Sequence, residues 1–209
     1  MENFTSRNSE VDSWKEAILI YNSALKEVST KLEILNDEFQ LVHKYNPIEH
    51  IKSRIKTSES IVKKLKKHGY ESTIENMVKY VNDIAGVRVI CSFTSDIYEI
   101  AQMIANQNDI HVVSVKDYIA NPKESGYQSY HMIVSVPIYF SDRNVNAKVE
   151  IQIRTVAMDF WATLEHKINY KFEKDIPKDI QKELIECAKI TATLDDRMMH
   201  LNEQVQAIR

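Results

Sequence analysis

Residues 148–154 read Lys-Val-Glu-Ile-Gln-Ile-Arg, a strict alternation of polar and apolar side chains. Successive side chains of an extended strand point to opposite faces, so the three apolar residues can be buried together. The other face then presents the carboxylate of Glu150, the amide of Gln152 and the guanidinium of Arg154. An ordinary solvated sheet face would show the same alternation, so the chemical interpretation depends on what other segments bring beside this face.

A second carboxylate, Asp83, comes shortly before Gly86, at a predicted junction between a helix and a strand. Two carboxylates that share a cleft repel each other, bind Mg²⁺ well and can include a general base. Asp83 and Glu150 are far apart in the sequence, and the sequence separation does not establish that they meet.

A basic stretch covers residues 52–67, where seven cationic side chains are offset by Glu59 alone. Such a stretch suits a polyphosphate, whose charge needs several cations. A solvated lysine face is the ordinary explanation of such a run, and the backbone phosphates of a nucleic acid are a third option. The cations are Lys52, Arg54, Lys56, Lys63, Lys64, Lys66 and Lys67. On a helix, one face would collect Ser60, Lys63, Lys64 and Lys67.

The segment Lys123-Glu-Ser-Gly-Tyr-Gln-Ser-Tyr-His131 has the composition of a binding loop. Gly126 allows a sharp turn that exposes Tyr127. An exposed tyrosine can stack on a base, while Lys123 and His131 flank phosphate or base edges. A hairpin with cross-strand tyrosines is the alternative.

Composition bounds the kind of protein. The chain has 209 residues, 44% of them hydrophobic, and a net charge of -3, which gives no global attraction to nucleic acid or to an anionic membrane. We see neither a signal pattern nor an apolar run of about 18 residues, so no membrane partner is expected. Cys91 and Cys187 each stand inside an apolar pattern, which predicts buried free thiols and a reducing cytoplasm.

Heptad spacing predicts two long terminal helices, over residues 10–45 and 178–208. Their apolar seams can pack inside the molecule or against another subunit. Residues 46–172 form the predicted core of one compact unit covering 1–209. Within it we expect helices over residues 57–68, from a capping box Ser72-x-x-Glu75 to Asn82, from a cap at Asp96 to Gln107, and over 155–172 with Trp161 and Leu164 inward. Strands are expected over 86–93 and near 110–116, 130–138 and 147–154. The predicted fold is α+β, with a mixed or antiparallel sheet of about five strands flanked by helices.

Taken together, these segments resemble the small alarmone synthetases of the RelA/SpoT-homologue family, of the RelP type. The matching motifs follow the family's order over about residues 46–172. They are Asn46-Pro-Ile-Glu-His50, Ser53-Arg-Ile-Lys56, Asp83-Ile-Ala-Gly-Val-Arg88, Lys116-Asp-Tyr118, Lys123–His131, Glu150-Ile-Gln-Ile-Arg-Thr155 and Asp159–Lys167.

The resemblance implies a nucleotidyltransferase-like sheet and a pyrophosphokinase, which moves the β,γ-diphosphate of ATP to the 3′-hydroxyl of GDP or GTP and releases AMP. It implies that Asp83 and Glu150 hold Mg²⁺ and that Glu150 helps to deprotonate the attacking hydroxyl. The implied ATP-binding residues are Arg54, Lys56, Ser60, Lys64, Lys67 and Arg88. The implied GDP- or GTP-binding residues are Lys116, Lys123, Tyr127, His131, Gln152 and Asp159, with Tyr127 stacked on guanine.

The resemblance also implies a homotetramer assembled through the terminal helices. The longer relatives carry a hydrolase built on a His-Asp motif, whereas no histidine of this chain precedes an aspartate, so hydrolysis is not expected. One alternative function is a non-catalytic nucleotide- or RNA-binding oligomer, which loss of Asp83, Glu150 or Tyr127 would have favoured. Another is a nucleotidyltransferase acting on RNA or an antibiotic, which usually shows a Gly-Ser pair and an Asp-x-Asp string that are absent here.

Overall fold

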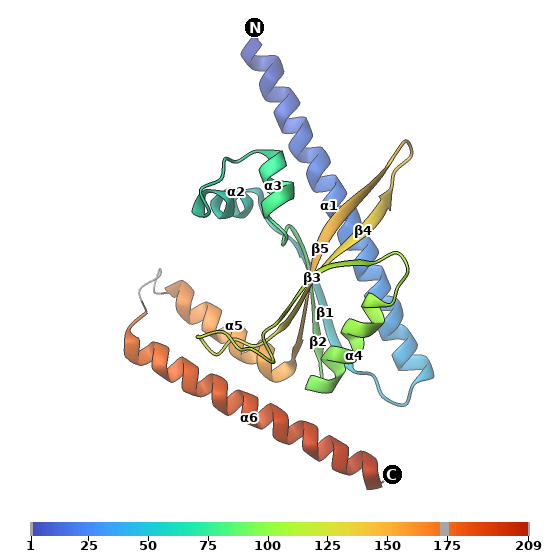
Figure 1. Ribbon diagram of the computed structural model, residues 1–209, viewed down its shortest axis with the longest axis vertical. Coiled ribbons are helices and arrows are strands. Elements are labelled where there is room, and N and C mark those ends of the chain that lie inside the picture. The colour runs from blue at the N-terminus through green and yellow to red at the C-terminus, as the bar shows by residue number, and fades with distance from the viewer. Residues whose placement is uncertain (1, 172–175, 209) are drawn as a thin grey trace.

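The computed structural model describes residues 2–171 and 176–208. A sheet of five strands lies at its centre in the order β1-β2-β5-β4-β3 (Figure 1). Strands β2 and β5 are parallel, and the other neighbouring pairs are antiparallel, so the predicted α+β fold with a mixed sheet is confirmed. The elements are α1 (Glu2–Val42), β1 (Ile48–Ile55), α2 (Ser58–Lys67), α3 (Ile74–Tyr80), β2 (Ala85–Cys91), α4 (Thr94–Ala105), β3 (His111–Asp117), β4 (Tyr130–Tyr139), β5 (Asn144–Thr155), α5 (Val156–Lys171) and α6 (Lys178–Ile208).

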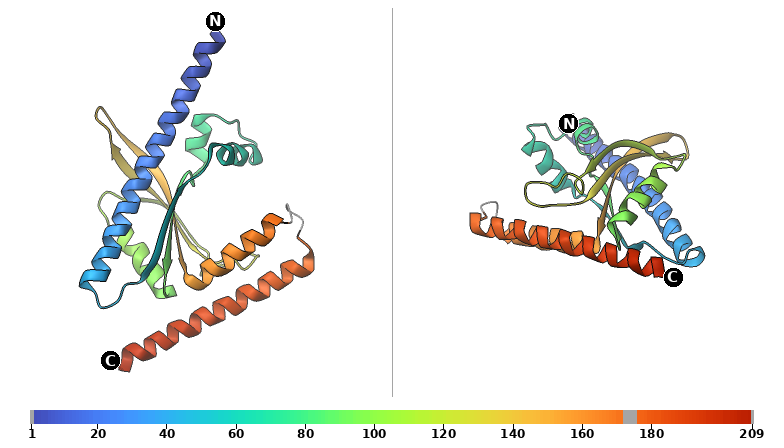
Figure 2. Two further views of the ribbon diagram at one scale, coloured as in Figure 1. Left: turned by 180° about the vertical axis from the view of Figure 1, so that it is seen from behind. Right: turned by 60° about the horizontal axis from the view of Figure 1, so that its bottom comes forward.

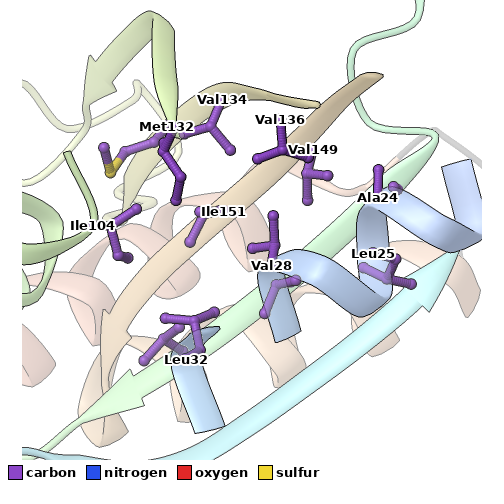
Figure 3. Close-up of a cluster of buried hydrophobic side chains, with 14 of the residues drawn as sticks. Ala24, Leu25, Val28, Leu32, Ile104, Met132, Val134, Val136, Val149 and Ile151 are labelled. Atoms are coloured by element: carbon purple, nitrogen blue, oxygen red, sulfur yellow. The ribbon is translucent and has the colours of Figure 1, made fainter. Parts of the chain in front are cut away.

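One face of the sheet is apolar and carries the core. Helix α1 runs diagonally across this face, as the left view of Figure 2 shows. Helix α4 packs against strands β2 and β5. Val28 and Leu32 of α1 are almost fully buried against Val149 and Ile151 of β5 (Figure 3). The heptad seam of α1 is therefore used mainly inside the molecule, because its central residues fill this layer.

Helices α5 and α6 pack side by side at the end of the molecule away from the N-terminus of α1 (Figures 1 and 2). The indole N–H of Trp161 donates a hydrogen bond of 3.0 Å to the carbonyl oxygen of Leu184. Asp195 of α6 is buried and accepts a bond of 2.6 Å from the hydroxyl of Thr155. These two bonds fix α6 against the start and the middle of α5.

The heptad seam of α6 does not coincide with its packed stripe. Ala188 and Asp195 are the buried residues of this helix, whereas Leu194, Met198, Leu201 and Val205 of the seam are about half exposed. Although α6 also contacts α4, about half of the surface of each of these seam residues stays accessible.

Strand β1 is absent from the sequence prediction. Its residues Ile48, Ile51 and Ile55 are spaced by three and four positions, which hides the alternation of a strand. A register shift between Ile48 and His50 explains the irregular spacing, because a bulge moves later side chains to the other face.

Two helix caps were predicted at the wrong residue, one to three positions from the observed cap. The cap before α3 is Thr73 and not Ser72, because the Thr73 hydroxyl accepts a hydrogen bond of 3.2 Å from the Asn76 N–H. The helix ends at Tyr80 rather than near Asn82. Asp96 lies inside the first turn of α4, where its carboxylate accepts from the Phe93 N–H at 2.9 Å. In both cases a neighbouring residue can adopt the extended conformation of a cap, and the sequence does not choose between them.

Two expected burials are also wrong. Cys91 is buried but Cys187 is exposed, although both thiols are free as predicted. Trp161 is buried as expected, whereas Leu164 is 41% exposed because the buried stripe of α5 passes through Met158 and Ala162 instead. Each helix in the described part of the chain is too short or too polar to cross a lipid bilayer.

Gly126 and Gly69 both have positive φ, at 87° and 77°, but their surroundings differ. A Cβ at Gly126 would stand 2.5 Å from the Cβ of Ala188 in α6, whereas a Cβ at Gly69 meets nothing within 4 Å. We expect Gly69→Ala to lower the free energy of unfolding by about 1 kcal/mol, the cost of the left-handed backbone. Gly126→Ala should add an overpacking cost of about 1–3 kcal/mol. Urea denaturation measures both.

Ala188→Gly in the Gly126→Ala background provides the matched test. The double variant should be more stable than the sum of the two single effects, because the second change removes the clash created by the first. Strict additivity would contradict the direct contact between this loop and α6.

Candidate active site

A row of polar side chains crosses all five strands on the face opposite the core. The register places Lys52 beside Arg88, Arg88 beside Gln152, Gln152 beside His131, and His131 beside Lys116. Neighbouring strands lie about 4.8 Å apart, so the row spans roughly 20 Å. The sheet thus gathers residues from distant parts of the sequence into one line.

Asp83 lies in the turn before β2 and is held by two lysines. Lys56 and Lys64 each donate a bond of 2.7 Å to a different oxygen of its carboxylate. Burial raises the pKa of Asp83, but the hydrogen bonds and charges of the two lysines outweigh it, so the pKa lies below its ordinary value. Asp83 is therefore ionised at neutral pH.

Glu150 occupies the polar face of β5, next to this turn. The Nδ1 atom of His131 is 3.3 Å from Oε1 of Glu150, and the amide of Gln152 donates to Oε2 at 2.8 Å. Burial raises the pKa of Glu150, whereas the bonds from His131 and Gln152 lower it to below its ordinary value. The charge of Asp83 acts in the opposite sense on this pKa, so the two carboxylates lie within electrostatic reach of each other.

Two pockets open on this face, and both are lined by Asp83 and Glu150. The first has a volume of about 180 Å³ and the second of about 350 Å³. The first is also lined by Lys52, Ser53, Arg54, Gly86, Val87, Arg88 and Gln152. The second is also lined by Lys64, Tyr80, Asn82, Ser114, Lys116, Tyr118, Lys123, His131 and Ile133. Each pocket thus brings cations to a shared pair of carboxylates.

The loop between β3 and β4 forms one side of the second pocket. The ammonium group of Lys123 lies 4.6 Å from the ring centres of both Tyr118 and Tyr127. The Tyr127 hydroxyl is 2.9 Å from Nε2 of His131. Gly126 donates its N–H to the Lys123 carbonyl at 2.8 Å, which closes the turn and sets the tyrosine next to this cation.

Nine of the fourteen predicted site residues line at least one pocket, whereas Lys56, Ser60, Lys67, Tyr127 and Asp159 line neither. Gln152 lines the first pocket and not the second, and Asp159 contacts the site through Arg88, which donates to it at 3.1 Å. Ser60 and Lys67 line neither pocket; the N–H of Ser60 donates to Thr57, which caps α2. The predicted nucleotide contacts of all fourteen residues remain predictions.

The chain resembles known proteins in both sequence and structure. Residues 53–175 match the family model described as "Region found in RelA / SpoT proteins". The chain belongs to the RelA/SpoT family. The family expected from the sequence motifs is thus confirmed, while the RelP type remains a prediction.

Family members of similar length resemble the chain along most of it. The GTP pyrophosphokinase YwaC of Bacillus subtilis is 48% identical over 195 residues, which are 93% of each chain. The crystal structure of small alarmone synthetase 2 from the same organism has a TM-score of 0.84 at 46% identity, covering 91% of this chain and 98% of that one. The structure of small alarmone synthetase 1 from B. subtilis bound to its product pppGpp has a TM-score of 0.86 at 34% identity. The match covers 93% of this chain and 98% of that one.

Three residues of this RelA/SpoT site had no role predicted from sequence. Tyr118 and Asn82 line the second pocket, and Arg154 is buried behind both pockets. The alternation of residues 148–154 already placed Arg154 on the same face as Glu150, and this was the sequence signal that could have assigned it to the site. The partners of Arg154 come from other parts of the chain, so its role could not be inferred from β5 alone.

The ion pairs of Asp83 predict an acid-sensitive contribution to stability. Because its pKa is lower in the folded chain, the contribution is fully present above the unfolded value of about 3.9 and is lost as the pH falls through the folded value. In the native chain the free energy of unfolding should fall as the pH drops below about 4, and in Asp83→Asn it should fall less steeply. Urea titrations at several pH values measure both slopes. Asp142→Asn, which removes an exposed partner of Arg143, should leave the slope nearly unchanged. Equal slopes for Asp83→Asn and the native chain would contradict this assignment.

Proposed function

We propose that the chain is a GTP pyrophosphokinase that transfers the β,γ-diphosphate of ATP to the 3′-hydroxyl of GDP or GTP, forming ppGpp or pppGpp and AMP. The observation that carries this proposal is the pair of cation-lined pockets that share Asp83 and Glu150. A reaction between two nucleotides needs two such pockets with a common catalytic edge. The activity named for YwaC and the pppGpp bound to a homologous synthetase support the same reaction.

The first pocket suits ATP. Arg54 and Arg88 project from neighbouring strands, and planar guanidinium groups can stack on both sides of an adenine. The Nε atom of Arg88 is buried and has no hydrogen-bond partner among the described residues. Lys56 and Lys64 do not line this pocket, but both bond Asp83 at the edge that the two pockets share, where they could neutralise the phosphates of ATP. The phosphate contacts of Ser60 and Lys67 rest on the family resemblance alone.

The second pocket suits the guanine nucleotide. Lys116, Lys123 and His131 line it and supply positive or donor groups for the phosphates. Tyr127 lies behind this lining, beside Lys123 and His131, and we propose that its ring stacks on guanine. Gln152 and Asp159 touch this pocket through other side chains, so we propose that they orient its residues rather than bind guanine themselves.

Glu150 is proposed as the general base. Its lowered pKa keeps it ionised at neutral pH, and His131 and Gln152 fix both of its oxygens. The 3′-oxygen of the acceptor attacks the β-phosphorus and transfers its proton to Glu150. The bond from the β-phosphorus to the bridging oxygen breaks, and AMP leaves with that oxygen.

Mg²⁺ is the proposed cofactor, held by Asp83 and Glu150. Among the described residues, no group of three or more His, Cys, Asp or Glu side chains could hold a metal ion. Two carboxylates nevertheless fit Mg²⁺, which commonly takes one or two protein ligands together with substrate phosphates and water. When bound, the ion would neutralise charge on the transferred diphosphate.

Replacement of Glu150 by glutamine tests the reaction. Glu150→Gln should retain the fold and nucleotide binding but lower kcat by about 10²–10⁴-fold, the usual contribution of a general base. Ion-exchange separation of products from ATP and GDP measures AMP and ppGpp, which should form in equal amounts in the native chain. Glu49→Gln, an exposed change outside both pockets, is the control. Full activity of Glu150→Gln would remove Glu150 from this role, and nucleotide binding without turnover in the native chain would favour a non-catalytic binding protein.

A homotetramer is proposed, with α6 as a principal contact. Its exposed seam of Leu194, Met198, Leu201 and Val205 has the spacing of a helix-to-helix interface. The seam of α1 is less available because its central residues fill the core. The two free cysteines support a cytoplasmic location.

Charge placed on this seam should dissociate the oligomer. We expect Leu194→Glu with Leu201→Glu to shift sedimentation velocity toward the monomer, because two carboxylates would be buried in the contact. Thr193→Glu with Gln204→Glu, at exposed positions of α6 beside the seam, is the matched control. An unchanged profile for the seam variant would show that α6 does not form the contact.

A further inference from the structure

Arg154 is the most deeply buried cation of the site, with 5% of its surface exposed. Its guanidinium contacts four side chains, which come from β5, α5 and the loop between β3 and β4. Nε donates to Ser129 at 3.3 Å, Nη1 to Asp159 at 3.3 Å and Nη2 to Gln152 at 3.1 Å. Nη2 also donates to the hydroxyl of Tyr127, and the guanidinium lies 5.1 Å from the centre of that ring.

These contacts reach both pockets. Toward the first pocket, Oδ1 of Asp159 accepts from Arg154 and also from Arg88 at 3.1 Å. Toward the shared edge, Gln152 accepts from Arg154 and donates to Glu150. Toward the second pocket, the Tyr127 hydroxyl meets both Arg154 and His131. One buried guanidinium is thus a common neighbour of the proposed adenine-binding, base and guanine-binding residues.

Charge strengthens the connection. Two guanidinium groups share one oxygen of Asp159, so a displacement of either arginine changes the hydrogen bonding of the other. Burial and the nearby charge of Arg154 lower the pKa of Arg88, whereas the charge of Asp159 between them raises it. A buried network of this kind costs most when it is partly satisfied, so its members tend to be ordered together.

We propose that Arg154 is a positioning residue that couples the two nucleotide sites. This inference rests on the proposed function, since it assigns a base to each pocket. A guanine stacked on Tyr127 fixes the ring and hence Arg154, which in turn fixes Asp159 and Arg88. ATP then meets an ordered site and loses less conformational entropy on binding, and the reverse holds for GDP after ATP.

Binding measurements on the intact chain test the coupling. The Kd of a non-hydrolysable ATP analogue is measured by calorimetry without GDP and at saturating GDP. In the native chain we expect the Kd to fall by about fivefold or more, the lower range of typical coupling between sites. In Tyr127→Phe, which keeps the ring but removes the hydroxyl that Arg154 contacts, the ratio should approach one. Arg154→Lys, which keeps the charge but cannot reach all four partners, should do the same.

Asp96→Asn serves as the control, because Asp96 is equally buried but lies outside this network, bonded to Tyr45 and Phe93. It should retain the native ratio even where it lowers the melting temperature. A native ratio of one would overturn the inference, and so would native coupling in either Tyr127→Phe or a folded Arg154→Lys. Tyr127→Phe keeps the test decisive if the Arg154 variant folds poorly.

A double-mutant cycle separates positioning from simple loosening. Tyr127 and Asp159 both contact Arg154, so Tyr127→Phe and Asp159→Asn should have non-additive effects on the Kd of the ATP analogue. In an Arg154→Met background the two effects should become additive. Unchanged non-additivity in that background would overturn the role of Arg154.

The two proposals fail in different ways. Cooperative binding of both nucleotides without formation of AMP would contradict the pyrophosphokinase reaction and support the coupling through Arg154. Full turnover with independent binding of the two nucleotides would support the reaction and overturn the coupling.

Discussion

The parallel pairing of β2 with β5 is the constraint on which the site depends. It sets Gly86 beside Glu150 and Arg88 beside Gln152, and it joins the turn that carries Asp83 to the strand that carries Glu150. A slip of one residue would turn Glu150 into the apolar layer and Val149 out of it, because side chains alternate along a strand. The buried residues of α1 and α4 prevent this slip, so the hydrophobic core fixes the register that the chemistry needs.

Electrostatics gives this arrangement its second property. The net charge of the chain is negative, yet its pockets hold more cations than carboxylates. Without nucleotide the cations share the available acids: Lys56 and Lys64 share Asp83, and Arg88 and Arg154 share Asp159. Phosphate groups entering beside Asp83 can therefore replace its carboxylate as the partner of the two lysines, which limits the cost of removing these cations from water.

Local pattern was sufficient to predict much of the fold. Alternation identified β5 and its polar face, and the heptad spacing identified α6 over its full length. Strand β1 escaped because a bulge breaks its alternation, and the cap of α3 was misplaced by one residue because two adjacent hydroxyl residues could serve. The identity of most pocket residues came from family motifs, whereas the contacts of Arg154 depend on long-range pairing that one segment does not encode.

The seating of the loop at Gly126 on α6 has a consequence for the order of synthesis. Most of the first pocket is built from residues up to Gln152, so its strands can pair while the rest of the chain is still being translated. The loop that carries Tyr127 rests on Ala188, which leaves the ribosome much later. A nascent chain at that stage has the first pocket but an unsupported loop at Tyr127, and the emergence of α6 is the step that gives this loop its support.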